Sequence, residues 1–436
     1  MADEITEIKN RLDIVQYIGR YVRLEKAGSN YHALCPFHTE KSPSFFVYPS
    51  KQTWRCFGQC STGGSIFDFA MRYHNKDFRD TLEELAREAG VVINRYAGKT
   101  NTARAKLLAA NAFAAEFYHN HLLASAPARD YLLARGITLE TMRDWQLGFC
   151  GPNADLLREA QRKGIALRDL IAAGVMYEPD GADKPARQRF WGRITFPIRN
   201  EQGNVVGFGG RILPGEGIDT DKVAKFINTR ETAVFNKRNR LYGIDKAKNE
   251  IRRADEVVVV EGYLDAVACH QAGFRNVVAS MGTALSEEQA RKLRRYTRRI
   301  VIALDPDTAG EQATERGLDV LSAVFTIPVS SWQGMLKNER VLDADLAVVS
   351  LPEGKDPDDM VLHDPDGWRA LIASAQNIVD YHLSLAAKLD VKGNARDKAI
   401  FAKRVLPIVR SVYDPIQQEH YILKLAQVIG VPADAV

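Results

Sequence analysis

The sequence predicts a multidomain protein that combines α+β and α/β architecture. Its 436 residues exceed what one ordinary core supports, three of its five cysteines fall between residues 35 and 60, and strands alternate with helices from residue 256 onward. The expected order is a metal-stapled ribbon, a basic α+β subdomain, a parallel-sheet α/β subdomain and a C-terminal helical bundle.

Composition and the N-terminus predict a soluble, unexported chain. Hydrophobic residues make up 45% and charged residues 26%, no apolar run is long enough to cross a bilayer, and the opening MADEITEIKNRLDIV is charged and amphipathic rather than a leader. Charge is uneven. Residues 185–253 carry 15 Lys and Arg against 7 Asp and Glu, whereas 256–360 carry 11 against 17. This suits a polyanion beside divalent cations, or two solvated faces of opposite sign.

The first 95 residues predict a short helix followed by a small β-ribbon. Within HALCPFH and TWRCFGQC, the spacing Cys35-x2-His38 and Cys56-x3-Cys60 supplies three thiolates and one imidazole from two turns. That set predicts one closed, structural Zn²⁺ site, against the alternative of reduced cysteines without a metal. Cys150 and Cys269 stand alone and are read as buried thiols.

Basic and aromatic residues are interleaved around this cluster, and they have two interpretations. Stacking rings and cations would bind single-stranded nucleic acid, or the rings could form the ribbon's core. The residues concerned are Lys41, Phe45, Phe46, Tyr48, Lys51, Trp54, Arg55 and Phe57.

The remaining boundaries follow from changes of pattern. We predict a zinc-ribbon DNA-binding domain over 1–95, a polar linker over 96–108, the basic subdomain over 109–250, the α/β subdomain over 251–365 and the helical subdomain over 366–436. In the basic subdomain, two apolar runs flank turn residues 200–204 and predict a hairpin. In the α/β region, VVVV, VVAS, VIAL, FTIPVSS and DLAVVSL are the expected strands.

Carboxylates follow three of these strands and predict a divalent-metal site at one edge of the sheet. The residues are Glu261, Asp305, Asp307, Asp356 and Asp358. Like charges gathered there would repel unless hard cations bind them, and a pair of magnesium ions would support phosphoryl transfer. A single acidic residue after a strand, such as Asp265, is as well explained by a helix N-terminus.

At this point several motifs together resemble bacterial replicative primases. CPFHTEKSPSFFVYPSKQTWRCFGQCSTGG resembles their zinc-binding domain, and EGYLD, DPDTAG and GKDPDD resemble the acidic motifs of the TOPRIM domain. YLLARG, RFWGRITFPIRNEQGNVVGFGGR, KFINTRET and FNKRNRLYG resemble their basic subdomain. The resemblance implies a DNA-directed RNA polymerase that makes short RNA primers de novo on single-stranded DNA, with two or more Mg²⁺ or Mn²⁺ ions.

The resemblance also implies roles for single residues. Glu261, Asp305 and Asp307 would be catalytic, Asp356 and Asp358 would join them in holding metal, and the template and nucleotide phosphates would contact Arg135, Arg189, Arg211, Lys225, Asn228 and Lys237. For Arg211 in GFGGR, the glycines are expected to permit close backbone approach. The bland alternative for each basic residue is a surface salt bridge.

Four departures from the family pattern stand out. The second zinc pair is spaced by three residues, DPD replaces DGD, Trp191 replaces an arginine, and residues 329–343 carry an insertion without a functional reading. The family implies a cytoplasmic, nucleoid-associated location at the replication fork, and the single-stranded DNA-binding protein is a candidate partner. The replicative helicase is expected to bind through a C-terminal domain that lies outside this chain.

Two rival functions share some of these features. A TOPRIM nuclease or type I topoisomerase would share the acidic motifs, although a topoisomerase would need a nucleophilic tyrosine in a large additional domain. A non-catalytic DNA-binding scaffold would explain the zinc set and the basic segment but would leave five carboxylates without a role.

Overall fold

The computed structural model describes residues 2–74, 76, 78–91, 97–152, 154–179, 181, 185–214, 223–282, 284–304, 308–329, 339–352, 354–388, 394–412 and 414–436. The chain divides into two compact units, 1–101 and 102–436. Each unit is described separately.

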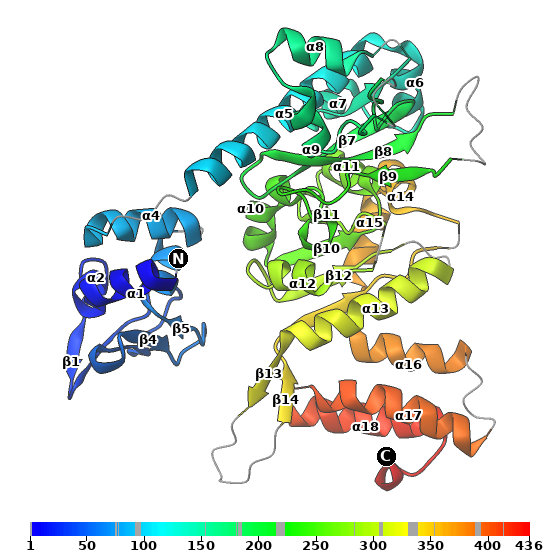
Figure 1. Cartoon of the computed structure of the whole chain (residues 1–436). Coiled ribbons are helices and arrows are strands. Elements are labelled where there is room, and N and C mark those ends of the chain that lie inside the picture. The colour runs from blue at the N-terminus through cyan, green and yellow to red at the C-terminus, as the bar shows by residue number, and fades with distance from the viewer. Residues whose placement is uncertain are drawn as a thin grey trace. The chain divides into compact units, whose positions relative to one another are not determined.

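The first unit is an antiparallel sheet in the order β1-β2-β3-β4-β5, accompanied by helices (Figure 1). Its elements are α1 (Ala2–Arg11), α2 (Ile14–Gly19), β1 (Glu25–Ala27), β2 (Asn30–Ala33), β3 (Phe45–Tyr48), the 3-10 helix η1 (Pro49–Lys51), β4 (Thr53–Cys56), β5 (Gly63–Gly64), α3 (Ile66–Tyr73) and α4 (Phe78–Ala89). Asp13 begins α2, because its side chain accepts hydrogen bonds from two backbone N–H groups at 2.9 Å.

The ribbon aromatics divide between core and surface. Along β3, Phe45 is buried and Phe46 is half-buried, as the two-residue period of a strand requires. Phe45 stacks on the buried Trp54 with ring centroids 5.1 Å apart. Phe57 is 59% exposed, and the Arg55 guanidinium lies 5.4 Å from its ring centroid. The core interpretation therefore holds for Phe45 and Trp54, while Phe57 and Arg55 remain available to a ligand.

The segment predicted as a linker, 96–108, is helical from Ala97 onward. It opens the long helix α5 (Ala97–Ala124), and the division between the two compact units falls inside it at 101/102. The last six residues of this stretch, ARAKLL, all have high helix propensity, which favours helix there.

The second unit begins with helices and an antiparallel sheet in the order β6-β7-β8-β9. Its elements after α5 are α6 (Ala126–Ala134), α7 (Leu139–Asp144), β6 (Gly148–Cys150), α8 (Leu156–Arg162), α9 (Leu167–Ala172), β7 (Arg193–Arg199), β8 (Val205–Ile212), β9 (Phe226–Asn228), η2 (Lys237–Asn239) and α10 (Ile244–Ala254). The predicted hairpin is confirmed: β7 pairs antiparallel with β8, and Asn200 closes the turn by accepting hydrogen bonds from the N–H groups of Gln202 and Asn204.

A mostly parallel sheet follows in the order β11-β10-β12-β15-β16 (Figure 1). Its region comprises β10 (Glu256–Val260), α11 (Tyr263–Gln271), β11 (Val277–Ala279), α12 (Glu287–Leu293), β12 (Arg299–Ile302), α13 (Thr308–Phe325), β13 (Thr326–Val329), β14 (Glu339–Leu342), β15 (Asp345–Val348) and α14 (Pro357–His363). One expectation was wrong. The described strand of FTIPVSS, β13, does not join this sheet, because it pairs antiparallel with the next strand, β14, in a separate hairpin, and strand periodicity does not encode the choice of partner.

The parallel sheet is buried on both faces, which explains its continuous apolar strands. Val258 and Val260 pack into one hydrophobic cluster together with rings of the basic subdomain such as Phe196 and Phe208. Val257 and Val259 point the other way, into a cluster formed with α12, α13 and the C-terminal helices. Alternation along one strand thus fixes the sheet between the basic subdomain and the closing helices.

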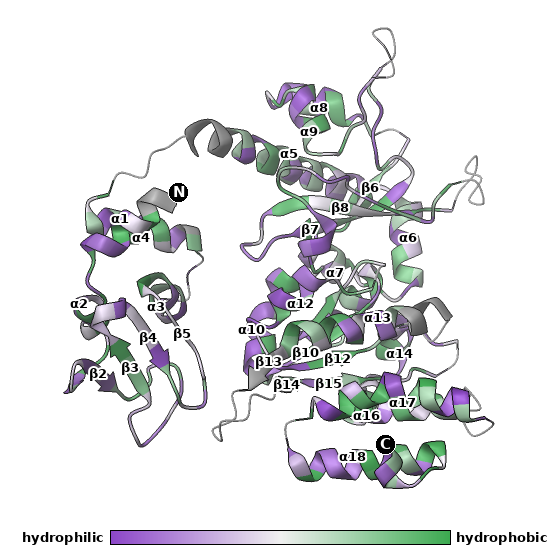
Figure 2. Ribbon diagram, turned by 60° about the horizontal axis from the view of Figure 1, so that its bottom comes forward, coloured by the Kyte–Doolittle hydropathy of each residue, from purple (hydrophilic) through white to green (hydrophobic). Residues whose placement is uncertain are grey.

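The chain closes with helices, as predicted. The elements are α15 (Pro365–Ala373), β16 (Gln376–Asn377), α16 (Ile378–Lys388), α17 (Ala395–Arg410), α18 (Pro415–Ile429) and η3 (Ala433–Ala435). Hydrophobic and hydrophilic residues are mixed along α17 and α18, as amphipathic packing requires (Figure 2). The short strand β16 departs from the expectation of helix alone. It adds an antiparallel edge to β15, and two residues are too few to show a period.

Candidate functional site

The predicted zinc ligands meet in the first unit. Cys35 and His38 follow β2, Cys56 ends β4, and Cys60 lies in the turn before β5. One ligand atom from each of the four residues lies within 4.8 Å of all the others. The x3 spacing of the second pair therefore does not prevent Cys60 from completing the set.

The surroundings of the His38 imidazole indicate which of its two nitrogens would bind the metal. His38 Nδ1 is buried and has no hydrogen-bond partner among the described residues, while Nε2 lies 2.9 Å from a carboxylate oxygen of Glu40. A metal-bound imidazole commonly gives its other N–H to a carboxylate, which fixes the ring and raises its basicity. This orphaned buried nitrogen, together with three thiols, fits a structural Zn²⁺ ion.

Glu40 is a functional residue that the sequence analysis missed. Its Oε1 accepts from the backbone N–H of Cys35 at 2.8 Å, and its Oε2 accepts from the hydroxyl of Ser44 at 2.5 Å. Ser44 also lies 3.3 Å from the sulfur of Cys56. One carboxylate therefore ties together both halves of the ligand set. The available signal was an acidic residue two positions after the ligand histidine.

The thiols of Cys35 and Cys56 differ in how readily they ionise. Burial acts to raise the pKa of Cys56, but hydrogen bonds, the largest from Ser44, lower it below the ordinary value. Burial raises the pKa of Cys35 to about 12, although a backbone hydrogen bond acts in the opposite direction. A buried thiol of this kind remains protonated unless a cation stabilises the thiolate.

The sheet topology gathers the acidic residues of the second unit at one edge. Strands β10 and β15 pair parallel with β12 on either side of it, so all three carboxyl ends face the same way. Glu261 directly follows β10, and Asp356 begins α14 after β15. Asp305 and Asp307, which would follow β12, lie outside the described residues.

Three carboxylates lie together at the start of α14. Single oxygens of Asp356, Asp358 and Asp359 lie within 4.8 Å of one another. Asp359 was not predicted. Asp358 is only 4% exposed, and Arg135 approaches it with an N–O distance of 3.4 Å. Burial raises the pKa of Asp358, and Arg135 partly offsets this increase.

Glu261 lies in a turn whose backbone conformation is held by hydrogen bonds. Its backbone oxygen accepts from the N–H groups of Met281 and Gly282 at 2.9 and 3.2 Å, and both of these residues have left-handed backbone conformations. Asp265 has the bland role that was considered for it, because its carboxylate accepts from the N–H of Gly262 at 2.7 Å and caps α11.

Lys237 lies beside the acidic edge. Burial lowers the pKa of its ammonium group, and the charge of Glu261 acts in the opposite direction. The charge of a carboxylate from EGYLD therefore acts on a residue of the basic motif FNKRNRLYG.

Three other basic residues lie on the antiparallel sheet or shortly before its strands. Arg189 donates from Nε and Nη2 to the backbone oxygen of Asn228 at 3.1 and 2.9 Å. The Arg211 guanidinium lies 5.2 Å from the ring centroid of Phe226 and 5.8 Å from that of Tyr131. Lys225 is exposed in the same segment.

The glycines of GFGGR have a different purpose from the one expected. A Cβ built on Gly209 would lie 2.2 Å from the Tyr263 ring, and one built on Gly210 would lie 2.6 Å from the Phe190 ring. The close approach that these glycines permit is therefore to the protein's own aromatic side chains.

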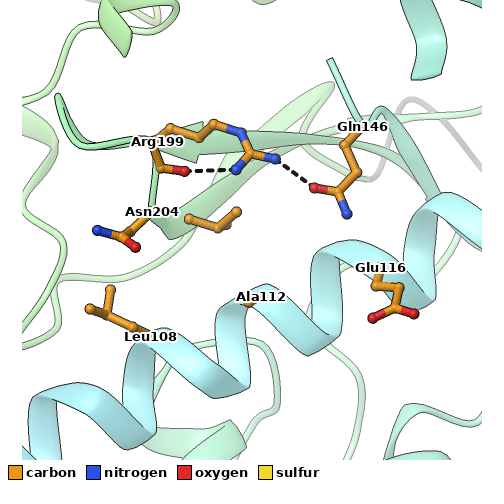
Figure 3. Close-up of a pocket in the computed structure, with 8 residues that line it drawn as sticks. Leu108, Ala112, Glu116, Gln146, Arg199 and Asn204 are labelled. Carbon is orange, nitrogen blue, oxygen red and sulfur yellow. Dashed lines mark hydrogen bonds between the residues drawn. The ribbon is translucent and has the colours of Figure 1, made fainter. Parts of the chain in front are cut away.

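A cavity of about 360 Å³ lies elsewhere in the second unit, between α5 and the β7–β8 turn (Figure 3). Leu108, Ala112 and Glu116 line it from α5, and Arg199 and Asn204 from the hairpin. None of the predicted site residues lines this cavity.

None of the helices described is both long and apolar enough to cross a membrane.

Models of four protein families match successive parts of the chain. The CHC2 zinc finger matches residues 1–101, the N-terminal domain of the DNA primase catalytic core matches 117–248, and the Toprim domain matches 255–329. The DnaB-helicase binding domain of primase matches 384–434. This last match corrects the expectation that the helicase-binding domain lies outside the chain, since it covers helices α17 and α18.

Whole-chain relatives agree with these matches. The DNA primase of Clostridium acetobutylicum is 34% identical over 441 residues, covering 100% of this chain and 69% of that protein. The DNA primase of Pseudomonas putida is 37% identical over 426 residues, covering 94% of this chain and 60% of that protein. The chain thus spans roughly two thirds of the length of these relatives.

A solved structure shares the fold across both units. The crystal structure of the Aquifex aeolicus primase, with its zinc-binding and RNA polymerase domains, is 29% identical in sequence and has a TM-score of 0.62. The match covers 99% of this chain and 98% of the Aquifex chain. A DnaG primase catalytic domain bound to single-stranded DNA is 27% identical with a TM-score of 0.62, covering 77% of this chain and 100% of that one. On the strength of its cluster of three cysteines and one histidine, its acidic sheet edge and these relatives, the chain belongs to the bacterial DNA primase family of DNA-directed RNA polymerases.

Proposed function

We propose that this chain synthesises short RNA primers de novo on single-stranded DNA by metal-dependent nucleotidyl transfer. The observation that carries the proposal is one edge of a parallel sheet, where carboxylates meet cations of the preceding subdomain: the charge of Glu261 acts on Lys237, and Arg135 lies 3.4 Å from Asp358 of the Asp356–Asp359 cluster. Carboxylates beside cations are what phosphoryl transfer on a polyanion requires. We place this activity in the cytoplasm, at the replication fork.

Two kinds of metal would serve this function. Cys35, His38, Cys56 and Cys60 would hold one Zn²⁺ that stabilises the ribbon. Glu261, Asp305, Asp307, Asp356 and Asp358 would hold two or more Mg²⁺ or Mn²⁺ ions. When bound, these ions would activate the attacking 3′-hydroxyl and neutralise the leaving pyrophosphate.

The protein's own contribution is to position the reactants and neutralise their charge. Arg189, Arg211 and Lys225 would hold template and nucleotide phosphates on the antiparallel sheet. Lys237 would bring a cation close to Glu261, where phosphate charge accumulates. Asn228 would act by fixing Arg189 through its backbone oxygen.

Arg135 takes a different role in this proposal. Its guanidinium lies 3.4 Å from the buried carboxylate of Asp358, so it would position that carboxylate and favour its charged form. Contact with phosphate is the alternative that the family resemblance implies.

The exposed Arg55 and Phe57 of the ribbon would contact single-stranded template by stacking and phosphate pairing. Ribonucleoside triphosphates would be the substrates. Residues 384–434 would provide the surface for the replicative helicase, and single-stranded DNA-binding protein would be a further partner.

The test separates synthesis from DNA binding. Glu261→Gln should abolish RNA synthesis from labelled ribonucleoside triphosphates, a loss of at least about 100-fold, because removing one charge from a metal-binding carboxylate raises the barrier by several kcal/mol. Affinity for single-stranded DNA should stay within about twofold of the unmodified chain.

Glu256→Gln is the matched control for this variant. Glu256 begins the same strand, β10, at the opposite edge of the sheet, and it pairs there with Arg299. Its replacement should leave synthesis unchanged. Full activity in Glu261→Gln would remove Glu261 from the reaction, cleavage of DNA without triphosphates would favour a nuclease, and tight binding without any turnover would favour a scaffold.

A further inference from the structure

Tyr263 connects the acidic edge to the basic sheet through packing. It begins α11 two residues after Glu261, and its side chain is 3% exposed. The ring stacks on Phe196 with centroids 5.0 Å apart and an interplanar angle of 12°. It also meets the ring of Tyr242 edge-on at 4.8 Å. The position of this ring relative to Glu261 is therefore fixed by the core.

The Tyr263 ring packs against strand β8, and its hydroxyl reaches a residue of the neighbouring strand β9. The ring fills the space beside Gly209 on β8, where any Cβ would clash. Gly209 is the register partner of Asn228 on β9. The hydroxyl of Tyr263 donates to Oδ1 of this same Asn228. Burial raises the pKa of Tyr263, so the hydroxyl remains a donor across the working pH range.

Asn228 links Tyr263 to Arg189 through hydrogen bonds. Its side chain accepts from Tyr263, and its backbone oxygen accepts two hydrogen bonds from the Arg189 guanidinium. The guanidinium also lies 5.2 Å from the ring centroid of Tyr177. Two N–H bonds to one oxygen fix the plane of the guanidinium, and Nη1 has no hydrogen-bond partner within the described part of the chain.

We propose that Tyr263 is a positioning residue, which holds the Asn228–Arg189 pair at a fixed place relative to Glu261 and so aligns the template with the acidic edge. The inference rests on the proposed function, because it assigns Arg189 to the DNA. Its specific content is that the hydroxyl of Tyr263, beyond the volume of the ring, contributes to template binding.

The test compares two buried tyrosines of the same core. Tyr263→Phe keeps the ring and removes the donor to Asn228. Tyr242→Phe is the control, because Tyr242 is 1% exposed, touches the ring of Tyr263, and its hydroxyl has no partner among the described residues. In primer synthesis by the full chain, Tyr263→Phe should raise KM for template DNA about fivefold to tenfold, with kcat within about twofold. Tyr242→Phe should change neither parameter.

A double-variant cycle distinguishes positioning from general stability. Arg189→Lys keeps the charge but loses the two-point contact with Asn228. If Tyr263 acts through Arg189, the double variant Tyr263→Phe with Arg189→Lys should bind DNA only about as weakly as Arg189→Lys alone. Losses that multiply, or a Tyr263→Phe variant that matches Tyr242→Phe, would overturn the inference. An unmodified chain that makes no RNA would overturn the proposed function instead.

Discussion

The two metal-binding regions of this chain are built in opposite ways. In the ribbon, all four ligands lie within 26 residues of sequence on turns between short strands, and their ligand atoms lie within 4.8 Å. At the acidic edge, Glu261 and Asp358 lie almost one hundred residues apart in sequence, and a parallel sheet with a buried core on both faces places them after the carboxyl ends of β10 and β15. We therefore expect the ribbon to depend on its metal, whereas the acidic edge is held in place by the fold.

The difference explains the roles that the two metals can have. A closed set of three thiolates and one imidazole leaves no position for a substrate, so the ribbon metal is structural. Oxygen ligands at the end of strands remain open to water and phosphate, and Asp356 and Asp359 are exposed there. A structural metal and catalytic metals can thus occur in one chain without competing for ligands.

Removal of zinc is expected to have the largest effect. Structural zinc contributes about 10–16 kcal/mol of binding free energy in small domains, so chelation should unfold the ribbon sheet while leaving the sheet of the second unit intact. Hydrogen exchange would measure this: amides of β3 and β4 should lose protection, and amides of β10 and β12 should keep it.

Cys56→Ser should reproduce the effect of chelation on the ribbon. Cys150→Ala and Cys269→Ala are the controls, since both cysteines are buried in the second unit, and these variants should retain one zinc per chain. Protected β3 and β4 amides in a fully zinc-free chain would show that the ribbon is held by its aromatic core alone.

A smaller effect is expected at the Arg135–Asp358 pair. Arg135 lowers the pKa of Asp358, which burial has raised, so Arg135→Ala should raise that pKa further. A protonated Asp358 binds metal poorly. The acidic limb of the magnesium-dependent pH–rate profile should therefore move to higher pH.

The same pair predicts a pH dependence of stability. Because the folded pKa of Asp358 lies above its unfolded value, its favourable contribution is present at low pH and is lost as pH rises through the folded pKa. The destabilisation caused by Arg135→Ala should therefore be larger at pH 8 than at pH 5 in urea unfolding. Arg162→Ala, which removes an exposed pair with Glu159, should show no such difference.

Local features of both sites could be predicted from sequence. Cys35, His38, Cys56 and Cys60 follow from spacing within turns, because neighbours in sequence are neighbours in space there. The run Val257–Val260 predicts a strand buried on both faces, and Glu261 after it predicts the acidic edge. Residue positions that depend only on the nearest strand or turn could therefore be predicted from the sequence.

Contacts between segments that are distant in sequence could not be predicted. Nothing near Asn228 indicates that Tyr263 will reach it, and the glycines beside Arg211 suggested a ligand where the structure has the Tyr263 ring. The choice of partner strand was also hidden from periodicity, both in the local hairpin of β13 with β14 and in the edge strand β16. The positions of Asp305 and Asp307 remain a prediction, since both residues lie outside the described part of the chain.

The metal dependence of primer synthesis, measured together with zinc content on the same sample, tests the separation of the two sites most directly. Asp356→Asn should raise the magnesium concentration for half-maximal synthesis about tenfold or more, because one ligand charge is lost, while zinc remains at one per chain. Asp366→Asn, a change at a side chain that is 92% exposed on α15, should alter neither quantity. An unchanged magnesium requirement in Asp356→Asn, or a loss of zinc along with activity, would contradict this account.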